Sequence, residues 1–203
     1  GASCEGAPRA IQIYDNMMEK RGKDFRISMK TGYSALDLVD GKSLKKVTVG
    51  SGVTWALRLP DGNTAVAKDP SIIIYGPTGA ATGKTITLPS GPADTVRAIN
   101  YNPANSHYFF SKGERPGHVY EITDTGATVW DTSLGTNSKG YVQFPREGGG
   151  VFATTGYLGS VVEIDVAKTI KTVVDGKKFT EYKVDFFSGF VRLPNGNFMV
   201  ASW

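Results

Sequence analysis

A sequence unit of about 45 residues recurs four times along this chain and begins a fifth time. Its clearest copies are Arg58–Asn63, which reads RLPDGN, and Arg192–Asn197, which reads RLPNGN. Two degenerate copies lie between them, at Asn100–Asn105 and Gln143–Gly148. Aspartate or asparagine followed by glycine favours tight hairpin turns, because these residues adopt positive φ at low cost. The repeat therefore predicts a chain built from many similar hairpins.

Each unit also contains short segments with strand-like alternation of apolar and polar residues. The expected first, innermost strands are Ala10–Tyr14, Trp55–Leu59, Arg97–Tyr101, Tyr141–Phe144 and Phe190–Leu193. The expected second strands are Phe25–Met29, Thr64–Ala67, His107–Ser111, Val151–Thr154 and Asn197–Ser202. The expected third strands are Tyr33–Leu38, Pro70–Tyr75, Gly117–Ile122 and Gly159–Ile164.

Short strands repeated with this period are typical of a β-propeller whose blades are four-stranded antiparallel sheets. We therefore predict an all-β fold with about four and a half blades in this chain. The predicted parts are a disordered N-terminal segment at 1–8 and a propeller at 9–203, with blades at approximately 9–50, 51–94, 95–138, 139–186 and, in part, 187–203.

The number of predicted blades leaves three arrangements open. Closed propellers typically have four to eight blades, and a partial blade has exposed strand edges. The chain is then a fragment of a larger propeller, or residues 187–203 complete a small ring, or a second chain supplies the remainder. We favour the fragment.

Composition excludes several classes of protein. The net charge of +4 comes from scattered lysine and arginine side chains, so we predict no nucleic-acid partner. No apolar run is long enough for a membrane-spanning helix. Cys4 is the sole cysteine, which rules out an internal disulfide. Residues 1–4 (GASC) resemble the end of a bacterial lipobox, whose cysteine carries lipid; the alternative is a free terminal thiol.

The repeat resembles the blades of bacterial extracytoplasmic propellers. The resemblance rests on the R-L-P-[DN]-G-N pattern, the apolar strand after it, and third strands such as Gly117–Ile122 and Gly159–Ile164. The nearest families are PQQ-like repeat proteins and arylsulfotransferase-type enzymes. Glu121–Trp130 is similar to the tryptophan-docking motif of PQQ-type blades, although it lacks the initial alanine and occurs in one unit. The resemblance implies a periplasmic or extracellular location and gives no reason to expect a quinone or another cofactor.

Superposition of the units predicts a ligand-binding rim. Lys30, Lys68 and Lys112 fall at the same point, the end of the second strand. Three ammonium groups on successive blades would form a positive arc that attracts anionic glycans or an acidic protein surface. The alternative is that these are ordinary hydrated strand ends. The full predicted ligand-binding set is Lys30, Lys68, Lys112, Arg115, Tyr33, Trp55 and Tyr157.

One register of the innermost strands is polar in every unit, and we predict that it lines the central channel. Its members are Gln12, Arg58, Asn100, Gln143 and Arg192. The alternative is that these groups form hydrogen bonds between neighbouring blades.

Catalytic signals are weak in this sequence. His107 and His118 are the only histidines, and neither has neighbours at metal-ligand spacing. A Gly-x-Ser-x-Gly nucleophile motif is absent. We therefore predict a non-catalytic propeller that binds a protein or an anionic glycan. The alternative is an enzyme acting on a sugar, a sulfate ester or a quinone-linked substrate, with catalytic residues partly outside this chain.

Overall fold

The computed structural model describes residues 25–29, 33–39, 43–48, 52–91, 96–141, 143–146, 148–181, 184–193 and 195–202. Within these residues the regular structure is β-strand, apart from a short 3-10 helix, η1 (Gly176–Lys178). The all-β prediction is therefore confirmed. The predicted first strand, Ala10–Tyr14, lies outside the described residues.

The strands form antiparallel sheets of consecutive strands. The first sheet contains β1 (Phe25–Met29), β2 (Tyr33–Val39) and β3 (Ser43–Thr48). The second contains β4 (Trp55–Arg58), β5 (Thr64–Lys68), β6 (Ser71–Tyr75) and β7 (Ala81–Thr87). The third contains β8 (Ala98–Asn102), β9 (His107–Lys112), β10 (His118–Ile122) and β11 (Thr128–Ser133). The fourth contains β12 (Gln143–Pro145), β13 (Val151–Thr154), β14 (Ser160–Ile164) and β15 (Ile170–Asp175), and the fifth contains β16 (Phe187–Arg192) and β17 (Phe198–Ser202).

The repeated RLPDGN motif is the hairpin turn between the first and second strands of a sheet. The Leu59 N–H donates to the Asn63 carbonyl oxygen at 2.8 Å, and the Gly62 N–H donates to the Leu59 oxygen at 3.0 Å. Gly62 has a φ of 86°, which favours glycine at this position. Leu193 and Asn197 repeat the first of these hydrogen bonds at 2.7 Å. The motif that defines the repeat therefore has a structural role.

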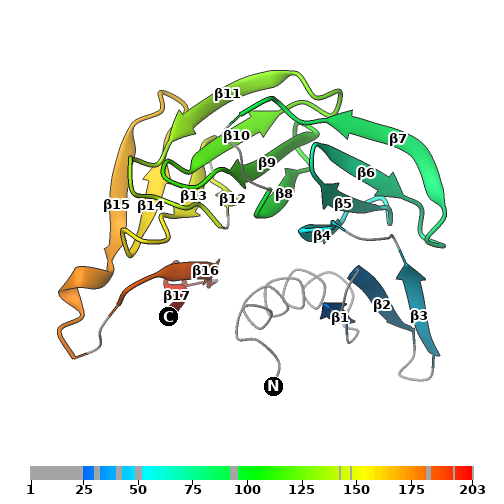
Figure 1. Ribbon diagram of the computed structural model, residues 1–203, viewed down its shortest axis with the longest axis horizontal. Coiled ribbons are helices and arrows are strands. Elements are labelled where there is room, and N and C mark those ends of the chain that lie inside the picture. The colour runs from blue at the N-terminus through cyan, green and yellow to red at the C-terminus, as the bar shows by residue number, and fades with distance from the viewer. Residues whose placement is uncertain are drawn as a thin grey trace.

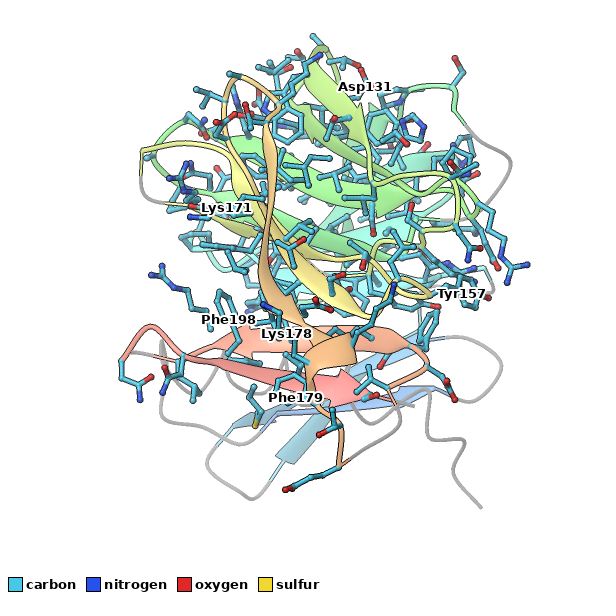
Figure 2. All side chains as sticks on the ribbon, turned by 90° about the vertical axis from the view of Figure 1, so that its left-hand side faces the viewer. Asp131, Tyr157, Lys171, Lys178, Phe179 and Phe198 are labelled. Carbon is cyan, nitrogen blue, oxygen red and sulfur yellow. The ribbon has the colours of Figure 1, made fainter. Side chains whose placement is uncertain are left out.

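The sheets follow one another around an arc (Figure 1). Strands β4, β8 and β12 lie on its inner side, and β7, β11 and β15 lie on its outer side. Each strand runs between two opposite faces of the molecule, and the loops that join the strands lie on these faces (Figure 1 and Figure 2). In Figure 2, which views the molecule from the side, Tyr157 lies on the right and Lys171 on the left.

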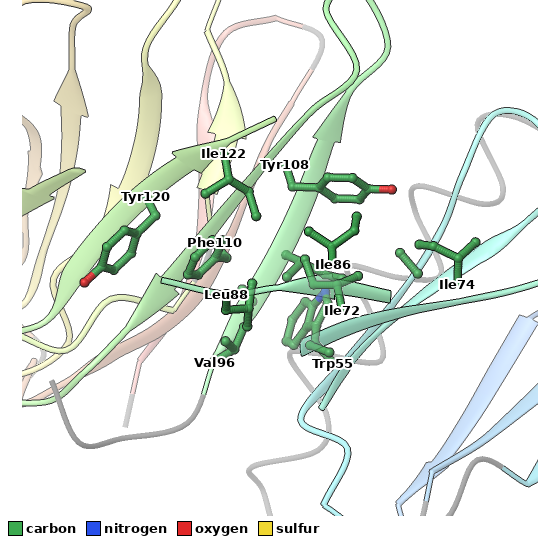
Figure 3. Close-up of a cluster of buried hydrophobic side chains, with 14 of the residues drawn as sticks. Trp55, Ile72, Ile74, Ile86, Leu88, Val96, Tyr108, Phe110, Tyr120 and Ile122 are labelled. Carbon is green, nitrogen blue, oxygen red and sulfur yellow. The ribbon is translucent and has the colours of Figure 1, made fainter. Parts of the chain in front are cut away.

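The largest apolar cluster packs between the second and third sheets (Figure 3). Ile72 and Ile86 come from the second sheet, and Phe110 and Ile122 come from the third; each is at most 1% exposed. The ring of Phe110 stacks on that of Tyr120 with their centroids 5.0 Å apart. Face-to-face packing of consecutive sheets is what four-stranded blades require.

Two further clusters continue this packing around the arc. One joins the third sheet to the fourth through residues such as Phe109 and Val162. The other joins the fourth sheet to the fifth through Phe152, Phe187 and Phe190. Clusters of buried apolar side chains therefore hold the third sheet against the second and fourth sheets, and the fourth sheet against the fifth.

Candidate functional site

Three loops of the third and fourth sheets meet at one end of the strands. They are the β9–β10 loop, the β11–β12 connection and the β13–β14 loop. The Arg115 N–H donates to the Ser138 carbonyl oxygen at 2.9 Å, and the Gly117 N–H donates to Ser138 Oγ at 3.0 Å. The Lys139 N–H donates to the Thr155 carbonyl oxygen at 3.1 Å. Hydrogen bonds donated by backbone N–H groups therefore fix the three loops to one another.

Glu114 is the centre of a polar network at this junction. Its carboxylate accepts hydrogen bonds from the Lys139 ammonium group and from the Tyr157 hydroxyl, the latter at 2.8 Å. The hydrogen bond from Lys139, followed by that from Tyr157, lowers the pKa of Glu114 below its usual value. The same carboxylate raises the pKa of Tyr157 above its usual value. At neutral pH Glu114 is therefore ionised and Tyr157 is a neutral donor.

Arg115 projects from the same loop toward solvent. Its guanidinium carbon lies 4.3 Å from the centre of the Tyr157 ring, a distance typical of a cation–π contact. Arg115 has a φ of 52°, in the left-handed region that non-glycine residues seldom adopt. Strained backbone of this kind is concentrated at functional sites. The loop therefore holds the exposed Arg115 guanidinium against the Tyr157 ring, although the backbone conformation of Arg115 is unfavourable in free energy.

Aromatic side chains extend this arrangement across the junction. The Phe186 ring packs edge-on against Tyr157 and Tyr141, at centroid distances of 4.8 and 5.3 Å. Arg97 and Lys139 lie 5.8 and 5.9 Å from the Tyr141 centroid. We refer to Arg97, Glu114, Arg115, Lys139, Tyr141 and Tyr157 as the rim cluster. Its three cationic side chains exceed its single carboxylate, so the cluster itself carries a positive charge.

The ion pair in the rim cluster leads to a pH-dependent prediction. The pKa of Glu114 is lower in the folded protein than in the unfolded chain, so its ionised carboxylate stabilises the fold. This stabilisation is complete above the ordinary glutamate pKa of about 4.3 and is lost as the pH falls through the pKa of the folded state. Glu114→Gln is expected to lower the free energy of unfolding by about 0.5–1 kcal/mol at pH 7, since the pair is partly solvated. Urea unfolding measured at pH 7 and at successively lower pH should show this difference shrinking as the Glu114 carboxylate is protonated. Glu181→Gln, at an exposed position, is the control, and a difference independent of pH would contradict the prediction.

The structure brings together two of the predicted ligand-binding residues, Arg115 and Tyr157. Lys112 lies on the same side of the blades but is only 6% exposed, and its ammonium group pairs with Asp69 at 3.2 Å. The charge of Lys112, on the third sheet, is therefore paired with a carboxylate of the second sheet. Trp55 is 3% exposed and belongs to the largest apolar cluster.

The other predicted ligand-binding residues have different surroundings. Lys68 is half-buried at the end of β5. Lys30 and the side chain of Tyr33 lie outside the described part of the chain. A continuous arc of three lysines therefore stays a prediction.

The predicted channel residues are also placed only in part. Arg58 is half-buried, and its Nη1 donates to Thr64 Oγ1 at 3.0 Å. Asn100 is 4% exposed, and its Nδ2 has no hydrogen-bond partner among the described residues. Arg192 is exposed, with its guanidinium carbon 5.3 Å from the centre of the Phe152 ring. Gln12 and the side chain of Gln143 lie outside the described residues.

The histidines are paired individually with carboxylates. His107 Nδ1 lies 2.6 Å from Glu121 Oε1, and His118 Nδ1 lies 3.5 Å from Asp131 Oδ2. Within the described segments, no group of three or more His, Cys, Asp or Glu side chains is arranged to hold a metal ion. These segments also contain no helix of the length and apolar character that crossing a membrane requires.

Four members of the rim cluster were not predicted from the sequence: Arg97, Glu114, Lys139 and Tyr141. They occupy different positions of the repeat, so residues at the same position of successive units do not reveal them. A usable signal was the loop 113–117 (GERPG), in which two charged residues stand between glycines and a proline. Loop residues lie on the surface and take part in binding more often than residues within strands do.

No protein-family model matches the sequence, and no curated protein matches it. Solved structures do match. A protein of unknown function from Bacteroides caccae is 19% identical with a TM-score of 0.66, covering 89% of this chain and 72% of that one. A streptogramin B lyase is 13% identical with a TM-score of 0.67, covering 90% and 60%. An extracellular domain from B. thetaiotaomicron is 10% identical with a TM-score of 0.61, covering 88% and 27%.

The chain has a β-propeller fold. The likeness to the lyase and to the extracellular domain, together with the four-stranded antiparallel sheets, establishes this architecture. The propeller chain spans 60% of the lyase and 27% of the chain that contains the extracellular domain. At identities of 10–19% the shared property is the fold.

Proposed function

We propose that this propeller binds an anionic glycan, carrying carboxylate or sulfate groups, at the rim cluster and does not transform it. The observation that supports this most directly is the exposed Arg115 guanidinium held over the Tyr157 ring. A planar guanidinium presents paired donors that match a carboxylate or sulfate group. Arg97, half-buried beside Tyr141, adds positive charge on the same rim.

The Glu114 network prepares the site for binding. Glu114 fixes the Tyr157 hydroxyl, and the Tyr157 ring in turn supports Arg115. The Lys139 ammonium group is occupied by Glu114 and supplies little free charge to a ligand. A side chain that is already held in position loses less conformational entropy when a ligand binds. The ligand therefore meets an ordered cation beside aromatic surface.

The protonation states favour binding over acid–base catalysis. A general acid or base works best with a pKa near the operating pH. The pKa of Glu114 is lowered and that of Tyr157 is raised, so both are moved away from neutrality. Enzyme activity is the second candidate, favoured by the likeness to a streptogramin B lyase, with catalytic residues partly outside this chain. Turnover of a substrate by the protein would support it.

We also propose an extracellular or periplasmic location. The resemblance of the repeat to extracytoplasmic propellers supports it, as does the likeness to an extracellular domain from B. thetaiotaomicron. This proposal includes attachment of lipid to Cys4, which lies outside the described residues. Mass spectrometry of the protein isolated from its native source would show the lipid directly.

The test of the proposed function is calorimetric titration with polygalacturonate and heparin oligosaccharides. Arg115→Ala is expected to weaken binding by about tenfold or more, since hydrogen bonds to charged groups contribute about 1.5–3 kcal/mol. Lys171→Ala removes the same charge from an exposed position on β15 and is the matched control. Equal affinities for the two variants would contradict a site at Arg115, and absence of binding by the unmodified protein would contradict the ligand class.

A further inference from the structure

Lys68, the last residue of β5, is a partly buried cation without a carboxylate partner. Among the other lysines whose side chains the structure describes, Lys84, Lys112 and Lys139 form ion pairs, and those between residues 168 and 178 are exposed. Lys68 is half-buried, and within the described part of the chain its ammonium group forms neither an ion pair nor a hydrogen bond. A charge that is partly removed from water is unfavourable unless an opposite charge or hydrogen bonds stabilise it. The ammonium group of Lys68 is therefore suited to bind an anion.

The strand fixes where the Lys68 side chain lies. Ala67 beside it is fully buried in the largest apolar cluster, between the second and third sheets. Successive side chains of a strand point to opposite faces, so Lys68 points away from that cluster. Its Cε lies 3.9 Å from the position that a Cβ atom would take at the exposed Gly52, which precedes β4. Because β4 lies on the inner side of the arc (Figure 1), the Lys68 side chain reaches the inner side of the rim.

Lys68 lies at the same end of the strands as the rim cluster. Asp69 follows it directly, and its carboxylate pairs with the Lys112 ammonium group at 3.2 Å, from the second sheet to the third. Lys112 ends β9 and begins the loop that carries Arg115. The ion pair therefore connects the Lys68 end of the second sheet to the Arg115 loop of the third. Lys68 and Arg115 lie on either side of this pair, whose two charges cancel.

We infer that Lys68 is a second anion subsite, and that the ligand of this rim is an oligosaccharide with anionic groups on several of its sugar units. The inference rests on the proposed function, in which Arg115 binds one carboxylate or sulfate group. A lysine ammonium group is a compact charge with three donors and binds such a group as a point charge. When one ligand molecule binds at both cations, the second contact forms at a high effective concentration. A ligand with one anionic group would contact only one of the two cations.

The experiment measures affinity against ligand length by calorimetric titration of the full chain. Oligogalacturonates of increasing length supply carboxylate groups, heparin oligosaccharides of matched lengths supply sulfate groups, and galacturonic acid supplies a single anionic group. Affinity is expected to rise by at least about tenfold once the oligosaccharide is long enough to contact both cations. The series that shows this rise identifies the anionic group that is recognised. An affinity that increases only in proportion to the number of sugar units in both series would overturn the inference.

Variants of Lys68 test the place of the second subsite. In Lys68→Ala the rise in affinity with ligand length should be lost, and in Lys68→Arg, which keeps the positive charge, it should be retained. Lys171→Ala removes a charge from an exposed position on β15 and should leave the rise unchanged. Urea unfolding of each variant checks that the fold is intact. A rise of the same size in Lys68→Ala as in the unmodified protein would overturn the second subsite.

Failure of this inference differs from failure of the proposed function. If Arg115→Ala weakens binding while Lys68→Ala binds every oligosaccharide as the unmodified protein does, the second subsite is wrong and the proposed function stands. If the unmodified protein binds neither series, the proposed function is wrong, and the second subsite with it.

Discussion

Replacing Phe110 with alanine is expected to lower the free energy of unfolding by about 3–5 kcal/mol. Phe110 is fully buried between the second and third sheets and stacks on Tyr120. The substitution removes a large apolar side chain and leaves a cavity that closely packed neighbours fill only in part. Ile72 and Ile122 are fully buried in the same cluster. Urea unfolding followed by tryptophan fluorescence would measure the change.

The matched control for Phe110 is an apolar residue on the surface. Val129 on β11 is 47% exposed, so Val129→Ala should change the free energy of unfolding by less than about 0.5 kcal/mol. A loss below about 1 kcal/mol for Phe110→Ala would contradict the model in which face-to-face packing holds the blades together. The comparison separates burial from the general effect of removing apolar atoms.

The strands were predictable because the same pattern of residue types occurs in successive repeat units. Asp61–Gly62 and Asn195–Gly196 mark turns through the conformational freedom of their residue types, which acts locally. Alternation then fixes the strands on either side, and the structure places β5 at Thr64–Lys68 where the sequence predicted Thr64–Ala67. Local chemistry and a fixed period were sufficient for the fold class.

The rim cluster was predictable only in part, because its members meet through tertiary structure. Arg115 and Tyr157 stand out in the sequence as a charge and an aromatic residue in loops. Glu114 and Lys139 are 25 residues apart, and their ion pair depends on how the β11–β12 connection crosses between blades. Trp55, which the sequence predicted to be a ligand-binding residue, is buried in the largest apolar cluster instead. Side-chain surroundings of this kind follow from packing between sheets.

Replacing Gly156 with alanine is expected to damage both stability and ligand binding. Gly156 has a φ of 60°, and a Cβ atom there would lie 2.5 Å from the Lys139 carbonyl oxygen and 3.1 Å from the Phe186 ring. Strain at positive φ costs about 1–2 kcal/mol, and overpacking adds about 1–3 kcal/mol. We therefore expect a loss of about 2–5 kcal/mol in the free energy of unfolding. Urea unfolding measures it.

Gly148 isolates the steric contribution to this effect. It has a φ of 81°, and an added Cβ would have no neighbour within 4 Å. Gly148→Ala should therefore cost only the backbone strain, about 1–2 kcal/mol. Because the Gly156 contact displaces Lys139 and Phe186, Gly156→Ala should also weaken binding of the oligosaccharides, while Gly148→Ala should not. Equal losses of stability and unchanged binding in both variants would mean that the β13–β14 loop does not hold the rim cluster in place.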